Sequence, residues 1–284
     1  MGVPVAYVTS TAAGKDDEVG LVLTGWNDAG MRGEIVRWDD PEVDWSSYDA
    51  AVVRSTWDYV TRRQEFVAWA RRVSGLTRLL NPAPVIERNT DKTYLRDLAE
   101  RGIPTVPTRW ISPGEAPDLM ERWPELVVKP SVSAGAKDTV RTASRAQALE
   151  HAWRLTKGGR TAMIQPYLDM VESEGETSLI FLGGRFSHAI RRQPMLSARG
   201  GMMTMTHRNR PAVREVDLDQ VILAKKILGM IPEELLFARV DLVRDARGAP
   251  ILLELELTEP YLFLRYAPHA SRRMAQALRI LASR

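Results

Sequence analysis

Two glutamates near the end of the chain have the spacing of a metal site. Segment 253–257 reads Leu-Glu-Leu-Glu-Leu, and alternation along a β-strand places Glu254 and Glu256 on one face and the three leucines on the other. Asp241 lies in the preceding apolar run, and a turn at 245–248 would fold the two runs together. Three carboxylates on one sheet face repel one another unless cations intervene, and such oxygen ligands suit Mg²⁺ or Mn²⁺. Spacing alone leaves a ladder of salt bridges to lysine or arginine equally open.

A lysine at the end of an apolar run has the surroundings of a phosphate-binding group. Lys129 follows residues 126–128 and precedes Pro130 and a loop of small residues, 131–139. An ammonium group and several backbone N–H groups of such a loop can meet at a phosphate. Taken by itself, the lysine is better explained as a solvated strand end. No Walker A, Gly-x-Gly-x-x-Gly, His-Glu-x-x-His or Gly-x-Ser-x-Gly motif occurs, which weakens the commonest nucleotide-binding, metalloprotease and hydrolase interpretations.

Polar and aromatic residues directly follow another apolar run, 50–53. Groups at the carboxyl ends of parallel strands face the ligand in open α/β folds, although Trp57 is explained equally well by packing between domains. The four histidines lack metal spacing, and the absence of cysteine excludes disulfides, thiolate nucleophiles and cysteine-ligated metals. The residues of this group are Arg54, Ser55, Thr56, Trp57 and Asp58.

Length and composition describe a globular protein. With 284 residues the chain has room for one large domain or two to three packed units. The net charge of +3 is spread along the chain and does not imply a nucleic-acid partner. No apolar run approaches the roughly 18 residues of a membrane span, and the N-terminal apolar stretch lacks a basic flank. We therefore expect a cytoplasmic protein that does not associate with membranes.

Three units are expected to position these residues, in an α/β fold that becomes α+β towards the C-terminus. Apolar runs alternating with helical spacing predict a small parallel α/β domain over 1–86. The central unit, 87–168, contains a predicted helix after 89–92, strands at 126–129 and 162–165, and a helix at 144–155. The third unit, 169–284, contains a hairpin with glycines at 183 and 184, helices at 217–228 and 270–282, and the acidic strand pair at 235–244 and 250–258.

The order of these features resembles that of the ATP-grasp ligases, which include D-alanine:D-alanine ligases, glutathione synthetases and glutamate-adding ligases. The resemblance spans nearly the whole chain and implies a small N-terminal domain followed by two α+β subdomains that clasp ATP. Segments 54–59, 81–86 and 253–263 are most similar to the subgroup that contains the O-ureido-serine cyclo-ligase of D-cycloserine biosynthesis.

The resemblance also implies roles for individual residues. The ATP-binding set would be Lys92, Lys129, Ser133, Gly135, Gln165, Tyr167, Leu168 and Glu176, with Gln165 standing where glutamate is usual. Lys129 and Arg192, or its neighbour Arg191, would contact the transferring phosphate. The metal ligands would be Asp241, Glu254 and Glu256, with Glu256 replacing the usual asparagine, and the ion would be Mg²⁺ or Mn²⁺. The substrate would meet Arg54, Ser55, Thr56, Trp57, Asp58 and Asp17, with Asp16 beside it.

By this resemblance the protein would be an ATP-dependent ligase. ATP would convert a small-molecule carboxylate to an acylphosphate, and a nitrogen nucleophile would displace phosphate to form an amide-type bond. The nucleophile could belong to the same molecule, as in cyclisation of O-ureido-D-serine to D-cycloserine, or to a second substrate, an amino acid or peptide. A nucleotide-binding module that has lost the chemistry is a further alternative, whereas two glutamates on one strand are too close for a glycoside hydrolase. Homo-oligomerisation is left open.

Overall fold

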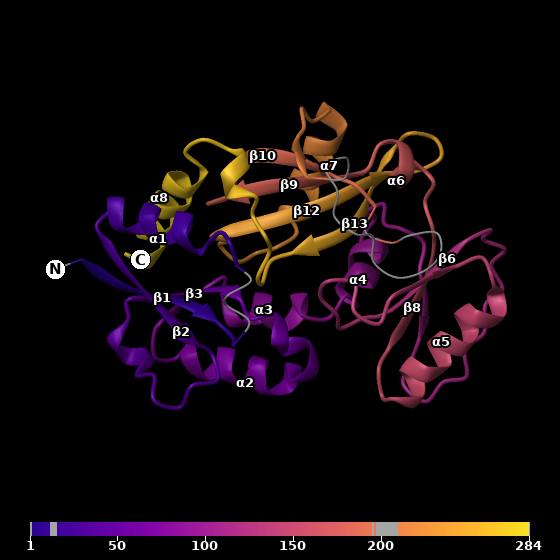
Figure 1. Ribbon diagram of the computed structural model, residues 1–284, viewed down its shortest axis with the longest axis horizontal. Coiled ribbons are helices and arrows are strands. Elements are labelled where there is room, and N and C mark those ends of the chain that lie inside the picture. The colour runs from indigo at the N-terminus through magenta and orange to yellow at the C-terminus, as the bar shows by residue number, and fades with distance from the viewer. Residues whose placement is uncertain (1, 12–15, 195, 197–209, 284) are drawn as a thin grey trace.

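The structure is a computed structural model that describes residues 2–11, 16–194, 196 and 210–283. Its strands form three sheets of four, four and five strands. Figure 1 shows the three sheets in a row, with the parallel N-terminal sheet at one end, the five-stranded sheet in the middle and the smaller antiparallel sheet at the other end. In the described ranges, no helix is long and apolar enough to cross a membrane.

The first sheet is parallel and is covered on both faces. Residues of β1 and β3 alternate between two cores, so that Val5 and Val52 pack with α1 and Ala6 and Val53 pack with α2. Burial on both faces explains why β3 is an uninterrupted run of buried residues. The strand order is β2-β1-β3-β4, and the elements are β1 (Val3–Thr9), α1 (Val19–Asp28), β2 (Met31–Arg37), β3 (Ala50–Ser55), α2 (Arg63–Val73) and β4 (Arg78–Leu80).

The second sheet is antiparallel and carries one helix on its outer face. The small residues Ala148 and Ala152 allow α5 to approach the sheet, where it packs against Val128 and Ile164. Strands β5 and β7 are three residues long and were not predicted. The order is β5-β8-β6-β7, formed by β5 (Arg109–Ile111), β6 (Leu126–Pro130), β7 (Val140–Thr142), α5 (Arg145–Lys157) and β8 (Ala162–Pro166).

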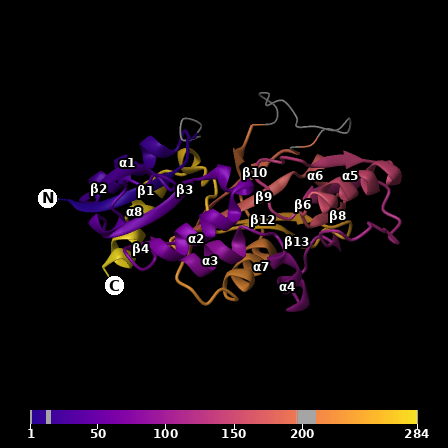
Figure 2. The same ribbon diagram turned by 90° about the horizontal axis from the view of Figure 1, so that it is seen from below.

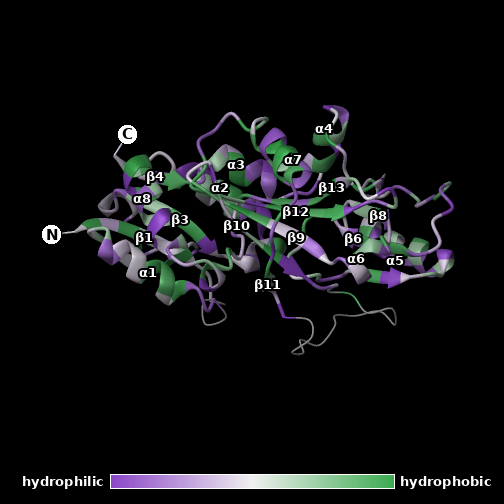
Figure 3. Ribbon diagram, turned by 90° about the horizontal axis from the view of Figure 1, so that it is seen from above, coloured by the Kyte–Doolittle hydropathy of each residue, from purple (hydrophilic) through white to green (hydrophobic). Residues whose placement is uncertain are grey.

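The third sheet is antiparallel and holds the acidic strand pair. The predicted hairpin is confirmed: Gly183 and Gly184 have φ values of +56° and +74°, which a two-residue turn between twisted strands requires. Strands β12 and β13 are largely green in Figure 3, in keeping with their burial. The order is β11-β10-β9-β12-β13, with β9 (Glu176–Leu182), β10 (Arg185–Arg192), β11 (Ala212–Val213), α7 (Leu218–Leu228), β12 (Phe237–Arg244) and β13 (Pro250–Glu256).

The C-terminal helix α8 (Ala270–Ala282) returns to the N-terminal unit. Met274 and Leu278 of α8 belong to the same buried cluster as Val22 and Trp26 of α1, and Figures 1 and 2 show the two helices side by side. The division into units at 86/87 and 168/169 stays a prediction, since a helix of the third unit completes the core of the first.

Two asparagines, one at the end of the N-terminal unit and one at the start of the central unit, bind the acidic strand pair. Asn81 donates from Nδ2 to Phe237 O at 2.9 Å and Leu257 O at 2.7 Å. Asn89, at the end of α3 (Ala83–Asn89), donates to Leu255 O at 2.7 Å. A turn was expected at this place, but Pro82 and Pro84 begin the helix, where their missing N–H groups have no intrahelical partner to lose. These bonds fix the end of β13 against the first sheet.

Candidate active site

A cavity of about 380 Å³ lies between the second and third sheets, and the loop 131–139 forms part of its wall. It is lined from three sides, by β6 and β8, by β13, and by residues that follow β3. Most residues that the sequence grouped as a site meet here. Those that line it are Trp57, Lys92, Lys129, Ser133, Gly135, Gln165, Tyr167, Leu168, Glu176, Arg192, Glu254 and Glu256.

The three predicted metal ligands come together at one side of this cavity. Asp241 of β12 stands opposite Glu254 of β13, and ligand oxygens of Asp241, Glu254 and Glu256 all lie within 4.8 Å of one another. Asp241 is fully buried, whereas Glu254 and Glu256 reach the cavity surface. Converging carboxylate oxygens at this spacing fit a hard divalent cation such as Mg²⁺. The residues present therefore fit the expected metal.

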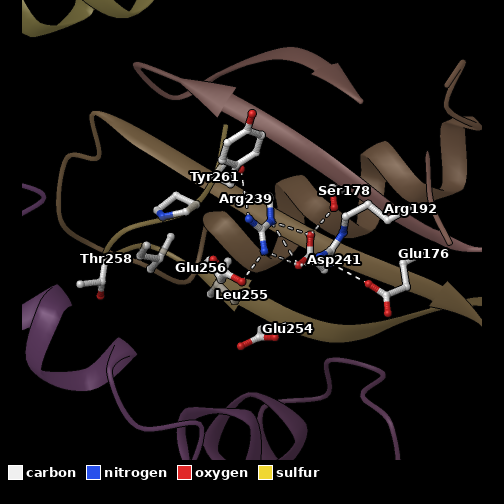
Figure 4. Close-up of polar contacts among 12 residues, drawn as sticks. Glu176, Ser178, Arg192, Arg239, Asp241, Glu254, Leu255, Glu256, Thr258 and Tyr261 are labelled. Atoms are coloured by element: carbon white, nitrogen blue, oxygen red, sulfur yellow. Dashed lines mark hydrogen bonds and ion pairs between the residues drawn. The ribbon is translucent and has the colours of Figure 1, made fainter. Parts of the chain in front are cut away.

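Two arginines surround the Asp241 carboxylate (Figure 4). Arg192 Nη2 donates to Asp241 Oδ2 at 2.7 Å and also lies 2.7 Å from Glu176 Oε2. Arg239 donates from Nε and Nη2 to Asp241 at 3.0 Å and pairs with Glu256. Burial opposes ionisation of Asp241, but the two arginines outweigh it and hold its pKa below the ordinary value. Arg239 was not predicted, although its position two residues before Asp241 on the same strand face was a usable signal.

The two glutamates of the cluster differ in their charge environment. Burial opposes ionisation of Glu254, yet Lys92 and Lys129 lower its pKa below the ordinary value. Burial raises the pKa of Glu256 to about 7, with Arg239 opposing the shift and the charge of Glu254 adding to it. Of the three carboxylates, Glu256 is therefore the one whose negative charge the neighbouring cations stabilise least.

A β-bulge corrects the predicted arrangement of the leucines. Asp241 pairs with Glu254, but the next residue, Leu242, pairs with Leu252, so Leu253 has no partner. Leu253 consequently packs with Val106 and Val171, whereas Leu255 belongs to the core cluster behind the sheet, and both leucines line the cavity. Strict alternation from 253 to 257 was therefore the wrong reading for its first leucine.

Two lysines face the carboxylates. Lys92 Nζ lies 3.1 Å from Glu254 Oε1 and donates to Ser133 O at 2.7 Å, which ties it to the loop 131–139. Lys129 Nζ has no carboxylate oxygen within 4.0 Å in the described part of the chain. Burial lowers the pKa of Lys129, and the nearby charge of Glu254 opposes that shift. An ammonium group held in the cavity without a direct partner suits an anionic ligand such as a phosphate.

The far end of the cavity is apolar. Leu168 and Leu253 pack with the buried side chains of Val106 and Val171, and all four line the cavity. Gln165 at the same end is buried and donates from Nε2 to Thr108 Oγ1 at 2.9 Å. An apolar slot beside an amide group fits a flat heteroaromatic ring such as a purine.

The structure separates the two candidate arginines. Arg191 turns away from the cavity and donates from Nε to Glu174 O at 2.5 Å and from Nη2 to Ser173 O at 2.7 Å. Adjacent side chains of a strand point to opposite faces, so Arg192 alone of the two reaches the cavity.

Most of the predicted substrate residues do not line the cavity. Arg54 is 2% exposed, and its buried guanidinium pairs with the carboxylate of Glu18 behind the loop that follows β13. Arg54 is not among the residues that line the cavity, and its contact with substrate stays a prediction. The others are bound elsewhere: Ser55 to Thr9, Asp58 to Trp38, Asp17 to Tyr261 and Arg265, and Asp16 to Tyr7, while Thr56 is fully buried.

Tyr59, the last residue of the segment 54–59 that carried the resemblance, lines the cavity with Trp57. Two residues that were not predicted, Glu259 and Tyr261, also line it. Tyr59 lies two residues after Trp57, and the other two follow the acidic strand by three and five residues. Their proximity to one another depends on the packing of the first sheet on the third, for which the sequence carried no signal.

Similarity to known proteins extends over nearly the whole chain. A family model described as the N-terminal domain of D-cycloserine synthetase DcsG matches residues 5–81. The cycloserine biosynthesis protein DcsG of Streptomyces lavendulae is 37% identical over 294 aligned residues, which cover 98% of each protein. The crystal structure of D-cycloserine synthetase DcsG has a TM-score of 0.89 at 36% identity and covers 98% of this chain and 99% of that chain.

Two further solved structures are similar in fold at low identity. A RimK-domain ATP-grasp protein from Sphaerobacter thermophilus has a TM-score of 0.70 at 15% identity, covering 99% of this chain and 100% of that one. D-Alanine–D-alanine ligase from Bacillus anthracis, complexed with ATP, has a TM-score of 0.71 at 12% identity, covering 99% and 98%. The predicted ATP-grasp fold is thereby confirmed.

Proposed function

Because the chain belongs to the D-cycloserine synthetase family of ATP-grasp ligases, we propose that it closes the ring of D-cycloserine from O-ureido-D-serine. Members of this family are ATP-dependent ligases that form a C–N bond, and the chain is such a ligase. The substrate is the part of the proposal that goes further, and it is supported by similarity that covers 98% of both proteins.

One observation carries the ligase chemistry: two lysines, an arginine and a carboxylate cluster line a single cavity. Phosphoryl transfer needs mainly positioning and neutralisation of charge. Lys92 and Lys129 would bind the phosphates of ATP, and Arg192 would steady the transferring phosphoryl group. The apolar end with Gln165 would receive the adenine, and Glu176 the ribose. Asp241, Glu254 and Glu256 would hold Mg²⁺, or Mn²⁺ in its place, which when bound neutralises phosphate charge.

The proposed reaction has three steps, and each of them balances. The γ-phosphoryl group passes to the substrate carboxylate, and the nitrogen attached to the side-chain oxygen then attacks the acyl carbon while phosphate leaves. That nitrogen carries a carbamoyl group, whose removal consumes one water and yields carbon dioxide and ammonia. Water must not reach the acylphosphate earlier, and the loop 131–139, tied to Lys92 through Ser133, is placed to cover it.

The test is ADP release by purified protein supplied with Mg²⁺, ATP and O-ureido-D-serine, with the product identified by mass and by its D-configuration. ADP and D-cycloserine formed without a second substrate would support the proposal. ADP that appears only when an amino acid and a separate amine are both present would replace it with a two-substrate ligase. ATP binding without ADP release under either condition would favour a silent nucleotide-binding module.

A further inference from the structure

One acidic residue of the cavity lacks the cationic partner that the others have. Four glutamates line the cavity, and three of them lie within 4.0 Å of a lysine or arginine nitrogen. The partners are Arg192 for Glu176, Lys92 for Glu254 and Arg239 for Glu256. In the ranges that the structure describes, no such nitrogen lies within 4.0 Å of Glu259.

Glu259 is nevertheless held away from bulk water. It is 8% exposed, and its Oε2 atom is buried without a hydrogen-bond partner among the described residues. Burial raises its pKa to about 8, the charge of Glu256 adds to the shift, and Lys92 and a hydrogen bond with Tyr59 oppose it. A buried carboxylate in this state is costly unless a cation joins it. The arrangement is that of a binding site for a positive group.

The backbone that carries Glu259 is fixed in place. Arg54 Nη1 donates to Pro260 O at 2.9 Å, and Glu18 accepts the N–H groups of Leu262 and Leu264 at 2.8 and 2.6 Å. Since these bonds fix the residues that follow it, the backbone position of Glu259 does not need to be ordered by a ligand.

We propose that Glu259, assisted by Tyr59, binds the α-ammonium group of the amino-acid substrate. This inference rests on the proposed function, because O-ureido-D-serine carries an ammonium group that takes no part in bond formation. That group is attached to the carbon next to the reacting carboxyl. A carboxyl placed at the phosphoryl-transfer groups therefore sets the ammonium only one carbon away, within the cavity that Glu259 also lines.

Two observations favour an ammonium over a further metal ion. Glu259 is absent from the set of carboxylates, Asp241, Glu254 and Glu256, whose ligand atoms lie within 4.8 Å of one another. The aromatic side chains of Trp57 and Tyr261 line the cavity with Glu259, and aromatic faces attract organic cations.

The test compares O-ureido-D-serine with its deamino analogue, 3-(ureidooxy)propanoate, on the wild type and on Glu259→Gln. The wild type should prefer the amino substrate strongly in kcat/KM. Glu259→Gln should lower kcat/KM for the amino substrate by about 100-fold, the order expected when one partner of a desolvated charge pair is lost, and leave the analogue nearly unchanged. The KM for ATP should not move. Glu259→Asp, which keeps the charge, should recover part of the preference.

The matched control is Glu233→Gln, which removes a surface carboxylate paired with Arg88 at 2.7 Å and should behave as the wild type. A preference in Glu259→Gln equal to that of the wild type would overturn the inference. Equal losses on both substrates, with a raised Mg²⁺ requirement, would also overturn it and assign Glu259 to the metal. Failure of the wild type to turn over O-ureido-D-serine would refute the proposed function itself, before any variant is compared, and this inference with it.

Discussion

Arg54 Nη2 and Glu18 Oε2 lie 3.1 Å apart, and their side chains are 1% and 0% exposed. The pair joins the end of β3 to the start of α1, and both members also bind the loop 259–264: Arg54 through Pro260 O, and Glu18 through two backbone amides. A residue predicted to touch substrate thus supports the loop that carries Glu259. We therefore expect any effect of Arg54 on the reaction to be exerted through that loop.

Breaking this pair should cost both stability and activity. Glu18→Leu leaves the Arg54 charge buried without its partner and should lower the free energy of unfolding by about 3–5 kcal/mol. The double variant Glu18→Leu with Arg54→Met should regain most of that loss, because no charge stays buried. Its kcat/KM should remain low, because the amides of the loop 259–264 still lack their acceptor. Urea unfolding and ADP release measure the two effects, and a single-variant loss below about 1 kcal/mol would contradict the assigned role.

The two neighbouring arginines should behave oppositely. Arg192→Met removes the guanidinium that joins Asp241 to Glu176 in the cavity and should reduce kcat by at least about 100-fold. Arg191→Met removes bonds to the carbonyls of Ser173 and Glu174 outside the cavity and should leave kcat within about threefold while lowering the melting temperature slightly. Steady-state ADP release measures kcat for both variants and tests this difference. Comparable losses of kcat would show that Arg191 also acts at the site.

The carboxylate cluster can be tested against the salt-bridge interpretation. Glu254→Gln keeps the shape of the side chain and removes one negative charge from the proposed metal site. If the cluster binds Mg²⁺, the Mg²⁺ concentration for half-maximal turnover should rise by about 100-fold or more, and excess Mg²⁺ should restore part of the activity. If Glu254 serves only to pair with Lys92 at 3.1 Å, the Mg²⁺ titration should match that of the wild type. Glu65→Gln, at a surface pair with Arg62, is the control.

Local patterns predicted most of the fold. The uninterrupted apolar run of β3, the glycine pair between β9 and β10 and the helical spacing of α7 are all short-range signals, and each element formed where it was expected. Strands β5 and β7 were missed because three residues hold too little periodicity. The bulge that turns Leu253 into the cavity depends on the partner strand, which the alternation of one segment does not reveal.

The sequence predicted which residues of the proposed nucleotide site line the cavity, but it predicted far fewer of those at the proposed substrate site. Lys129, Glu176 and Glu254 belong to single elements whose order along the chain carries the resemblance, and all three line the cavity. Tyr59 and Glu259 are 200 residues apart and meet only through packing of the first sheet on the third. Arg54 is a charged residue at the carboxyl end of a parallel strand, which suggested a ligand contact. The sequence could not show that Arg54 would form a buried ion pair with Glu18.

His188 should make the free energy of unfolding depend on pH, at values above those at which carboxyl groups ordinarily titrate and up to neutral pH. It lies on β10, is 8% exposed, and its Nε2 lies 2.9 Å from Leu262 O. Burial lowers the pKa of His188, and the charge of Arg273 adds to that shift. As the pH falls, His188 therefore takes up a proton in the unfolded chain before it does so in the folded chain. Neutral His188 stabilises the fold above the ordinary histidine pKa, and this stabilisation is lost as the pH falls from the ordinary pKa towards the lowered pKa of the folded chain. Urea unfolding from about pH 8 to about pH 5.5 should show this loss, and His188→Gln should show less of it. An equal pH dependence in the two proteins would assign the effect to other groups.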